Sequence, residues 1–123
     1  VCTDSGVDGQ YYQVIPIAVT AAENLECEVT AFQGTAGDST IQVYCDPFDP
    51  LQPLTNVVAY DDDDGTGALS IFTAADGVLL QPGQTYYLVF SPFYPDEVGD
   101  FTIAFTSATV QVVPVELQSL TAE

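Results

Sequence analysis

The sequence predicts an all-β fold: an antiparallel β-sandwich, jelly roll-like, with seven to nine short strands. Segments rich in Val, Ile, Thr, Tyr and Phe recur along the chain, and strands prefer these residues. Glycine, proline and aspartate separate the segments, as expected for turns. No stretch combines a sustained 3.6-residue period with capping residues, so helices are not expected. Short strands at this spacing, joined by proline-rich turns, favour a sandwich.

Alternation of apolar and polar side chains locates the individual strands. Residues 24–32 (NLECEVTAF) alternate apolar side chains with glutamates and a threonine. Residues 39–45 (STIQVYC) follow the turn QGTAGD and place Ile41, Val43 and Cys45 on one side. The other segments are short β-rich runs bounded by turn residues. The expected strands are residues 11–19, 24–32, 39–45, 55–61, 68–73, 84–91, 100–107 and 109–113.

The charge balance restricts the partners. The chain has 123 residues with 18 acidic side chains and no lysine, arginine or histidine, so its formal net charge is −18 at pH 7. Its hydrophobic content of 47% is too high for a disordered acidic tail. Nucleic acid is not an expected partner, because phosphate binding relies heavily on lysine and arginine. No apolar run approaches the length of a membrane span, so membrane insertion is not expected either.

The same composition restricts catalysis. Without histidine or lysine there is no Ser-His-Asp triad, no Cys-His pair, no imidazole zinc ligand and no Schiff-base lysine. A glycosidase-like pair of carboxylates is compatible with the composition. The acidic residues, however, cluster in turn-like stretches, where solvation or calcium is the commoner explanation. We therefore expect a protein that is not an enzyme.

The three cysteines suggest a disulfide. A chain without lysine or arginine offers trypsin-like proteases no site, which suits an extracellular location, where disulfides persist. If residues 24–32 and 39–45 form a hairpin centred on residues 34–37, Cys27 and Cys45 lie close across the two strands. We expect them to be bonded to each other, the alternative being two buried free thiols. Cys2 is then free or intermolecular.

The order of several short motifs resembles the bacterial pre-peptidase C-terminal domain. The motifs are GDSTIQVYC, NVVAYDDDDGTGALSIF, LLQPGQTYYLVFSP and GDFTIAF, and together they cover about residues 24–106. The resemblance implies a secreted jelly-roll sandwich that accompanies an enzyme or adhesin, often with calcium, and it implies no catalysis. The lack of basic residues and the third cysteine depart from the family pattern.

The end of the chain resembles another kind of sequence. VPVELQSLTAE (113–123) is similar to the stretch before the sorting tail of type IX secretion substrates. The resemblance implies export to the cell surface or beyond, with a removed segment after Glu123.

Four consecutive aspartates suggest a cation site. Asp61 to Asp64 repel one another, and the chain has no basic side chain to relieve them. Ca²⁺ accepts six to eight oxygens in a flexible geometry and suits such a loop. Resemblance to the family pattern adds Asp38 and supports Asp62 and Asp63, whereas Asp61 and Asp64 are included on proximity alone. The alternative is a solvated acidic turn in which Gly65 and Gly67 supply positive φ.

Two apolar features suggest contact surfaces. Phe93 and Tyr94 stand between prolines in SPFYPDE (91–97), and a rigid aromatic loop of this kind suits a polysaccharide or a protein surface.

We expect residues 1–107 to form the sandwich and 108–123 to form a C-terminal strand or linker. In the second segment Val110, Val112, Val115 and Leu117 are too apolar for a flexible linker, so they are candidates for pairing with a neighbouring subunit. The alternative is that residues 109–113 are the last strand of the same domain.

Two functions follow as expectations. The first is a non-catalytic, calcium-stabilised structural subunit that is secreted and self-assembles into a homo-oligomer, filament or surface coat. The second is an accessory module that binds polysaccharide or protein beside a secreted enzyme or adhesin. The sequence narrowly favours the first, because one self-contained domain carries an unpaired cysteine and an apolar terminal strand.

Overall fold

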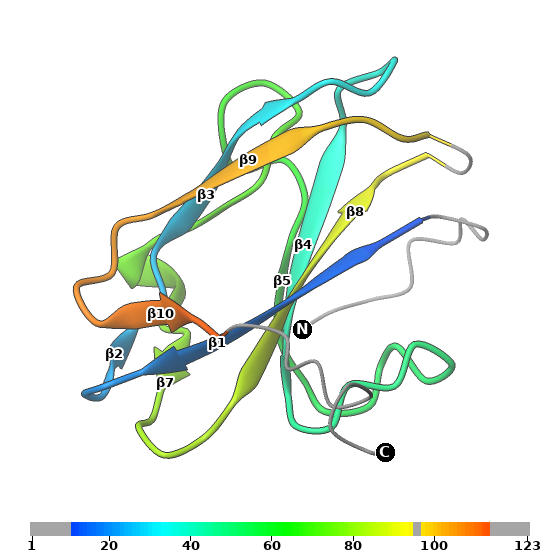
Figure 1. Cartoon of the computed structure of the whole chain (residues 1–123). Coiled ribbons are helices and arrows are strands. Elements are labelled where there is room, and N and C mark those ends of the chain that lie inside the picture. Colours follow the sequence, from blue (N-terminus) through cyan, green and yellow to red (C-terminus); the bar gives the residue numbers. More distant parts are fainter. Residues whose placement is uncertain (1–10, 95–96, 114–123) are drawn as a thin grey trace, which may run out of the picture.

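The computed structural model describes residues 11–94 and 97–113, and these form an antiparallel β-sandwich (Figure 1). The all-β prediction is confirmed. Ten strands are present in the described part, because the two-residue β2 and β7 pair at one end and are too short for a sequence pattern to reveal. The elements are β1 (Gln13–Val19), β2 (Glu23–Asn24), β3 (Cys27–Phe32), β4 (Ser39–Cys45), β5 (Val57–Asp61), β6 (Ile71–Phe72), η1 (Ala74–Asp76), β7 (Leu79–Leu80), β8 (Tyr86–Pro92), β9 (Phe101–Phe105) and β10 (Val110–Val112).

The strands form two layers and a small extra sheet. One layer has five strands in the order β10-β1-β8-β4-β5, and the other has three in the order β6-β3-β9. The pair β2-β7 forms the third sheet. Every pairing is antiparallel. In Figure 1, β3 and β9 lie side by side as one layer, facing the longer strands of the other.

The hydrophobic core lies between the layers. It consists of inward-facing side chains from both sheets, as the period of two in the strands dictates. The outer face of β4 is also covered, because Tyr44 packs against Phe48 and donates a hydrogen bond to the carbonyl of Pro53 at 2.7 Å. The buried apolar cluster comprises Ile17, Val19, Leu25, Cys27, Val29, Ile41, Val43, Phe72, Val78, Leu80, Tyr86, Leu88 and Phe90.

The expected hairpin between residues 24–32 and 39–45 is wrong. β3 pairs with β6 and β9, whereas β4 pairs with β5 and β8. The connection between β3 and β4 therefore crosses from one sheet to the other. Cys27 and Cys45 lie on opposite sheets, and both are free thiols that pack in or against the core. Burial raises the pKa of the Cys27 thiol to about 12 and so keeps it protonated.

The C-terminal strand expected after residue 107 pairs within its own chain, as the alternative held. β10 pairs with β1 of the same chain, with Val110 opposite Val19 and Val112 opposite Ile17. Residues 109–113 therefore include the last strand of the same sandwich. Val110 packs against the core, whereas Val112 is 54% exposed.

The segment just before β10 is hydrogen-bonded to the side chain of Glu23. The Glu23 carboxylate accepts hydrogen bonds from the backbone N–H groups of Ala108 and Thr109 and from the Thr109 hydroxyl. The other two residues expected to contact a neighbouring subunit, Val115 and Leu117, lie outside the described residues.

The only helix in the described part of the chain is the three-residue η1. Among these residues there is accordingly no helix with the length and apolar character to span a bilayer.

Candidate metal centre

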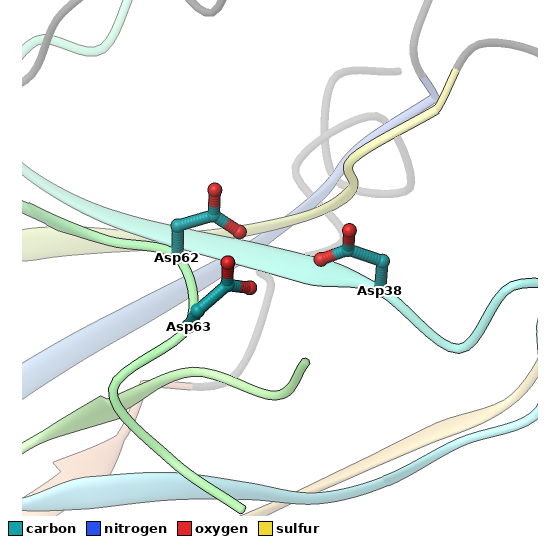
Figure 2. A group of neighbouring side chains, drawn as sticks. All are labelled: Asp38, Asp62 and Asp63. Carbon is teal, nitrogen blue, oxygen red and sulfur yellow. The ribbon is translucent and has the colours of Figure 1, made fainter. Parts of the chain in front are cut away.

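Three carboxylates converge at one end of the sandwich. One oxygen from each of Asp38, Asp62 and Asp63 can be chosen so that all three oxygens lie within 4.8 Å of one another. In Figure 2 the three side chains point toward a common space, Asp38 from the segment leading into β4 and the other two from the segment after β5. We call these three residues the carboxylate group. Three of the five aspartates proposed from the sequence therefore come together.

Strand pairing brings these residues together. β4 and β5 are antiparallel neighbours with Ile41 opposite Asp61, so the start of β4 and the end of β5 meet at one edge. Asp38 immediately precedes β4, and Asp62 immediately follows β5. The carboxylate group is thus positioned by β4 and β5 of the five-stranded sheet.

A buried pair of serines supports the backbone beneath the group. Ser39 and Ser70 have no exposed surface, and their hydroxyl oxygens are 2.9 Å apart. The Ser70 hydroxyl lies within donating distance of the carbonyls of Asp62, at 2.7 Å, and Ser39, at 2.9 Å. These contacts connect the segment after β5 to the start of β4 and so fix the separation of Asp62 from Asp38.

Asp61 and Asp64 lie outside the carboxylate group. Asp61 is buried, and its Oδ2 accepts hydrogen bonds from the N–H groups of Ile71, at 2.9 Å, and Asp64, at 3.3 Å. Its carboxylate closes the turn, and the Asp64 side chain is exposed. Gly65 allows the tight return, because a Cβ at this position would lie 2.8 Å from the carbonyl oxygen of Leu69. The two aspartates included on proximity alone therefore have other places: Asp61 closes the turn by accepting hydrogen bonds, and Asp64 faces solvent.

Burial and mutual repulsion disfavour charge on these aspartates. Burial, followed by the neighbouring Asp63 and Asp38, raises the pKa of Asp62 to about 7. Burial is also the first cause of the raised pKa of Asp38, with Asp63 next. Asp61 has a pKa of about 6, raised first by burial and opposed by the hydrogen bond from Ile71. A cation placed among the three carboxylates would reverse this penalty.

The polar atoms of the group fit a hard cation. Asp38 Oδ1 and Asp62 Oδ1 are buried, and no hydrogen-bond donor within residues 11–94 and 97–113 reaches either of them. A solvated acidic turn would expose such oxygens to water. The chain has no lysine, arginine or histidine to compensate them. Oxygen-only donors from flexible loops suit Ca²⁺ better than Zn²⁺, which prefers nitrogen and sulfur.

The aromatic loop lies next to the carboxylate group. The Phe93 N–H donates to the carbonyl of Asp38 at 3.0 Å. The Phe93 and Tyr94 rings meet edge to face at 5.0 Å, and Tyr94 is 48% exposed whereas Phe93 is half-buried. Only Tyr94 of the two expected contact residues is therefore presented broadly to solvent.

An open groove adjoins this loop. Tyr11 and Tyr12 are 56% and 50% exposed on its rim, and Val98 is 64% exposed. Phe90 and Phe101 stack in its wall with centroids 3.9 Å apart. The sequence placed Tyr11 and Tyr12 inside the first strand, but that strand begins at Gln13. The groove is lined by Tyr11, Tyr12, Gln13, Phe90, Pro92, Glu97, Val98, Gly99 and Phe101.

No local sequence pattern indicates the residues that support the site. Ser39 and Ser70 are 31 positions apart, and Glu97 contacts the loop before Asp38 from about 60 positions away. Serine and glutamate at such separations carry no local pattern. Ser39, which directly follows Asp38 at the start of the expected strand 39–45, is the one sequence signal of a polar support.

Comparison with protein-family models, curated proteins and solved structures finds no match to this chain. The similarity to pre-peptidase C-terminal domains and to type IX secretion substrates thus stays an expectation drawn from short motifs.

Proposed function

We propose that this chain is an extracellular, non-catalytic domain that binds Ca²⁺ through Asp38, Asp62 and Asp63 and is stabilised by it. The observation that carries the proposal is the convergence of the three carboxylates, with two buried oxygens that no donor reaches, in a chain without basic side chains. Bound only by the folded state, the ion stabilises the domain by mass action.

Titration calorimetry of the purified protein with CaCl₂ tests this proposal. The ionic strength is held constant with NaCl, so that general screening of the −18 charge does not imitate binding. We expect saturable binding that is abolished by Asp62→Asn and retained by Asp64→Asn, which removes a charge from the same run of aspartates. Heat that does not saturate, or equal loss in both variants, contradicts a site at the carboxylate group.

We further propose that the aromatic end is a contact surface for a polysaccharide. Tyr11 and Tyr12 present large exposed rings at one groove, and Tyr94 is exposed two residues after Pro92, which lines the same groove. Exposed apolar surface of this kind is typical of ligand-binding faces. The absence of basic side chains favours a neutral chain over an anionic one. The hydrogen bond from Phe93 to Asp38 connects this end to the carboxylate group.

Affinity electrophoresis in gels containing neutral polysaccharides tests the contact surface. We expect retardation that is lost in the double variant Tyr12→Ala and Tyr94→Ala, with an unchanged melting curve because both side chains are about half exposed. Leu51→Ala, at an exposed residue that does not line the groove, is the matched control. Unretarded wild-type protein across the polysaccharides contradicts this role.

Self-assembly is the second candidate, and one observation favours it. β10 is at the edge of the five-stranded sheet, and Val112 on it is exposed. An edge strand can pair with a second chain. The segment 109–113, however, completes its own domain, so the donated-strand argument applies only to residues outside the described part. Negative-stain microscopy with and without chelator distinguishes filaments from dispersed particles.

A further inference from the structure

A buried carboxylate on another loop contacts the segment that carries Asp38. Glu97 is 8% exposed, and its Oε2 accepts hydrogen bonds from the backbone N–H groups of Ala36, at 2.7 Å, and Gly37, at 3.3 Å. Asp38 follows Gly37 directly. The carboxylate therefore bonds to the two peptide units that set the direction of the chain into Asp38.

The approach of the two loops depends on small residues. A Cβ at Gly34 would collide with Glu97 Oε2 and with the Phe32 ring, and a Cβ at Gly99 would lie 2.8 Å from the backbone of Gln33 and Gly34. The Gln33 N–H also donates to the carbonyl of Asp100 at 2.8 Å. Glycine at these two positions thus allows residues 97–100 to lie directly against residues 33–37.

Burying an acidic side chain in a chain without cations is costly, so a compensating role is expected. The second oxygen, Oε1, is buried, and no donor in the described part of the chain reaches it. The other oxygen accepts two backbone hydrogen bonds, and these restrain a loop that contains two glycines.

We propose that Glu97 is a positioning residue for the cation site: by accepting hydrogen bonds from Ala36 and Gly37, it holds Asp38 facing Asp62 and Asp63. This inference rests on the proposed function. Outer partners of this kind orient the ligands of a metal, and their loss commonly lowers affinity by about 10–100-fold. Without Glu97, Asp38 would have to be ordered by the ion itself, at the expense of affinity.

Calcium titration of four variants tests the proposal. Glu97→Gln keeps an acceptor oxygen for Ala36 and Gly37, so we expect a Kd within about threefold of wild type, whereas Glu97→Ala weakens binding at least tenfold. Gly34→Ala displaces the same carboxylate, together with the Phe32 ring, while leaving Glu97 in the chain, and it weakens binding in the same way. Glu28→Gln makes the same charge change on β3 and leaves the Kd unchanged. Circular dichroism and melting in chelator establish that each variant is folded.

The outcomes separate the inference from the function on which it rests. If wild type binds Ca²⁺ and folded Glu97→Ala binds it equally well, the inference is overturned and the function stands, even where the variant melts earlier. If Glu97→Gln is as weak as Glu97→Ala, charge and not hydrogen bonding is responsible, and positioning is overturned. If Glu97→Ala does not fold, Gly34→Ala decides the matter. Wild-type protein that binds no Ca²⁺ overturns the function and the inference with it.

Discussion

Asp62 shows most clearly how this chain handles its acidity. Its pKa of about 7 arises first from burial and then from Asp63 and Asp38, and no basic side chain exists to lower it. In an ordinary protein an arginine or lysine beside such a carboxyl would favour its charged form. Here only a proton or a bound cation can do so. The free energy of unfolding of the cation-free domain should therefore be reduced at the neutral pH at which Asp62 ionises.

The stability of the cation-free protein should fall as the pH rises. Unfolded aspartate loses its proton near pH 4, whereas folded Asp61 and Asp62 retain theirs until about pH 6 and 7. Between these values the folded state binds more protons than the unfolded state, so the free energy of unfolding decreases with pH. We expect the melting temperature in chelator, at constant ionic strength, to be higher at pH 4.5 than at pH 7.5.

Asp62→Asn is the control for this pH dependence. It removes one of the three aspartates with a raised pKa, so the fall in melting temperature should be smaller than in wild type. A melting temperature that rises from pH 4.5 to 7.5 in wild type contradicts the raised pKa values.

Apolar alternation along a strand does not reveal which sheet the strand joins. Apolar alternation in residues 39–45 correctly indicated β4, in which Ile41 and Val43 are fully buried. The same pattern in residues 24–32 suggested a hairpin partner that β3 does not have. Alternation fixes which side chains face the core, but a connection of six residues fits a crossing between sheets as well as a hairpin.

Within the described residues, which do not include Cys2, both Cys27 and Cys45 are free thiols. After unfolding in iodoacetamide without reductant, we expect mass spectrometry to find both Cys27 and Cys45 alkylated. In the folded protein Cys27 should resist alkylation at pH 8, because it is 2% exposed and its pKa is about 12. A peptide pair joined through Cys27 and Cys45 would contradict the assignment of both residues as free thiols.

The attachment of β10 depends on a small number of polar contacts. The Glu23 carboxylate binds Ala108 and Thr109, and the hydrogen bond from the Thr109 side chain is the first cause of the lowered pKa of Glu23. We expect Glu23→Ala to reduce the hydrogen-exchange protection of the β10 amides that pair with β1, while β4 and β8 keep theirs. Glu28→Ala is the matched control. Unchanged protection would show that strand pairing alone holds β10.

Lowering the pH should weaken the contact of Glu23 with Ala108 and Thr109. This pH dependence is opposite in direction to that of Asp62, because the pKa of Glu23 is lowered and that of Asp62 is raised. Because the pKa of Glu23 is lowered in the folded state, its contribution is present above its unfolded value, near pH 4.3, and is lost as the pH falls. Protection of β10 should therefore weaken below about pH 4, where the core of the domain remains folded.

The molecule as a whole combines an ordinary apolar core with an unusual charge pattern. Fold class and the location of the acidic turn could be predicted, because both depend on local sequence: β-rich segments between turns, and four aspartates in a row. The convergence of Asp38 with Asp62 and Asp63 was expected from a resemblance. The hydrogen bonds that support the site could not be predicted, because they join residues that only the folded sandwich brings together. These are the contacts between Ser39 and Ser70 and between Ala36 and Glu97.

The most direct test of the calcium proposal is differential scanning calorimetry of wild type, Asp62→Asn and Asp64→Asn. Each is scanned at pH 7.5 and fixed ionic strength with CaCl₂ or with NaCl alone. We predict that Ca²⁺ raises the melting temperature of wild type and of Asp64→Asn, with a shift that grows with ligand concentration, and leaves Asp62→Asn unshifted. Equal shifts in all three proteins, or none beyond that produced by NaCl, would contradict a calcium site formed by Asp38, Asp62 and Asp63.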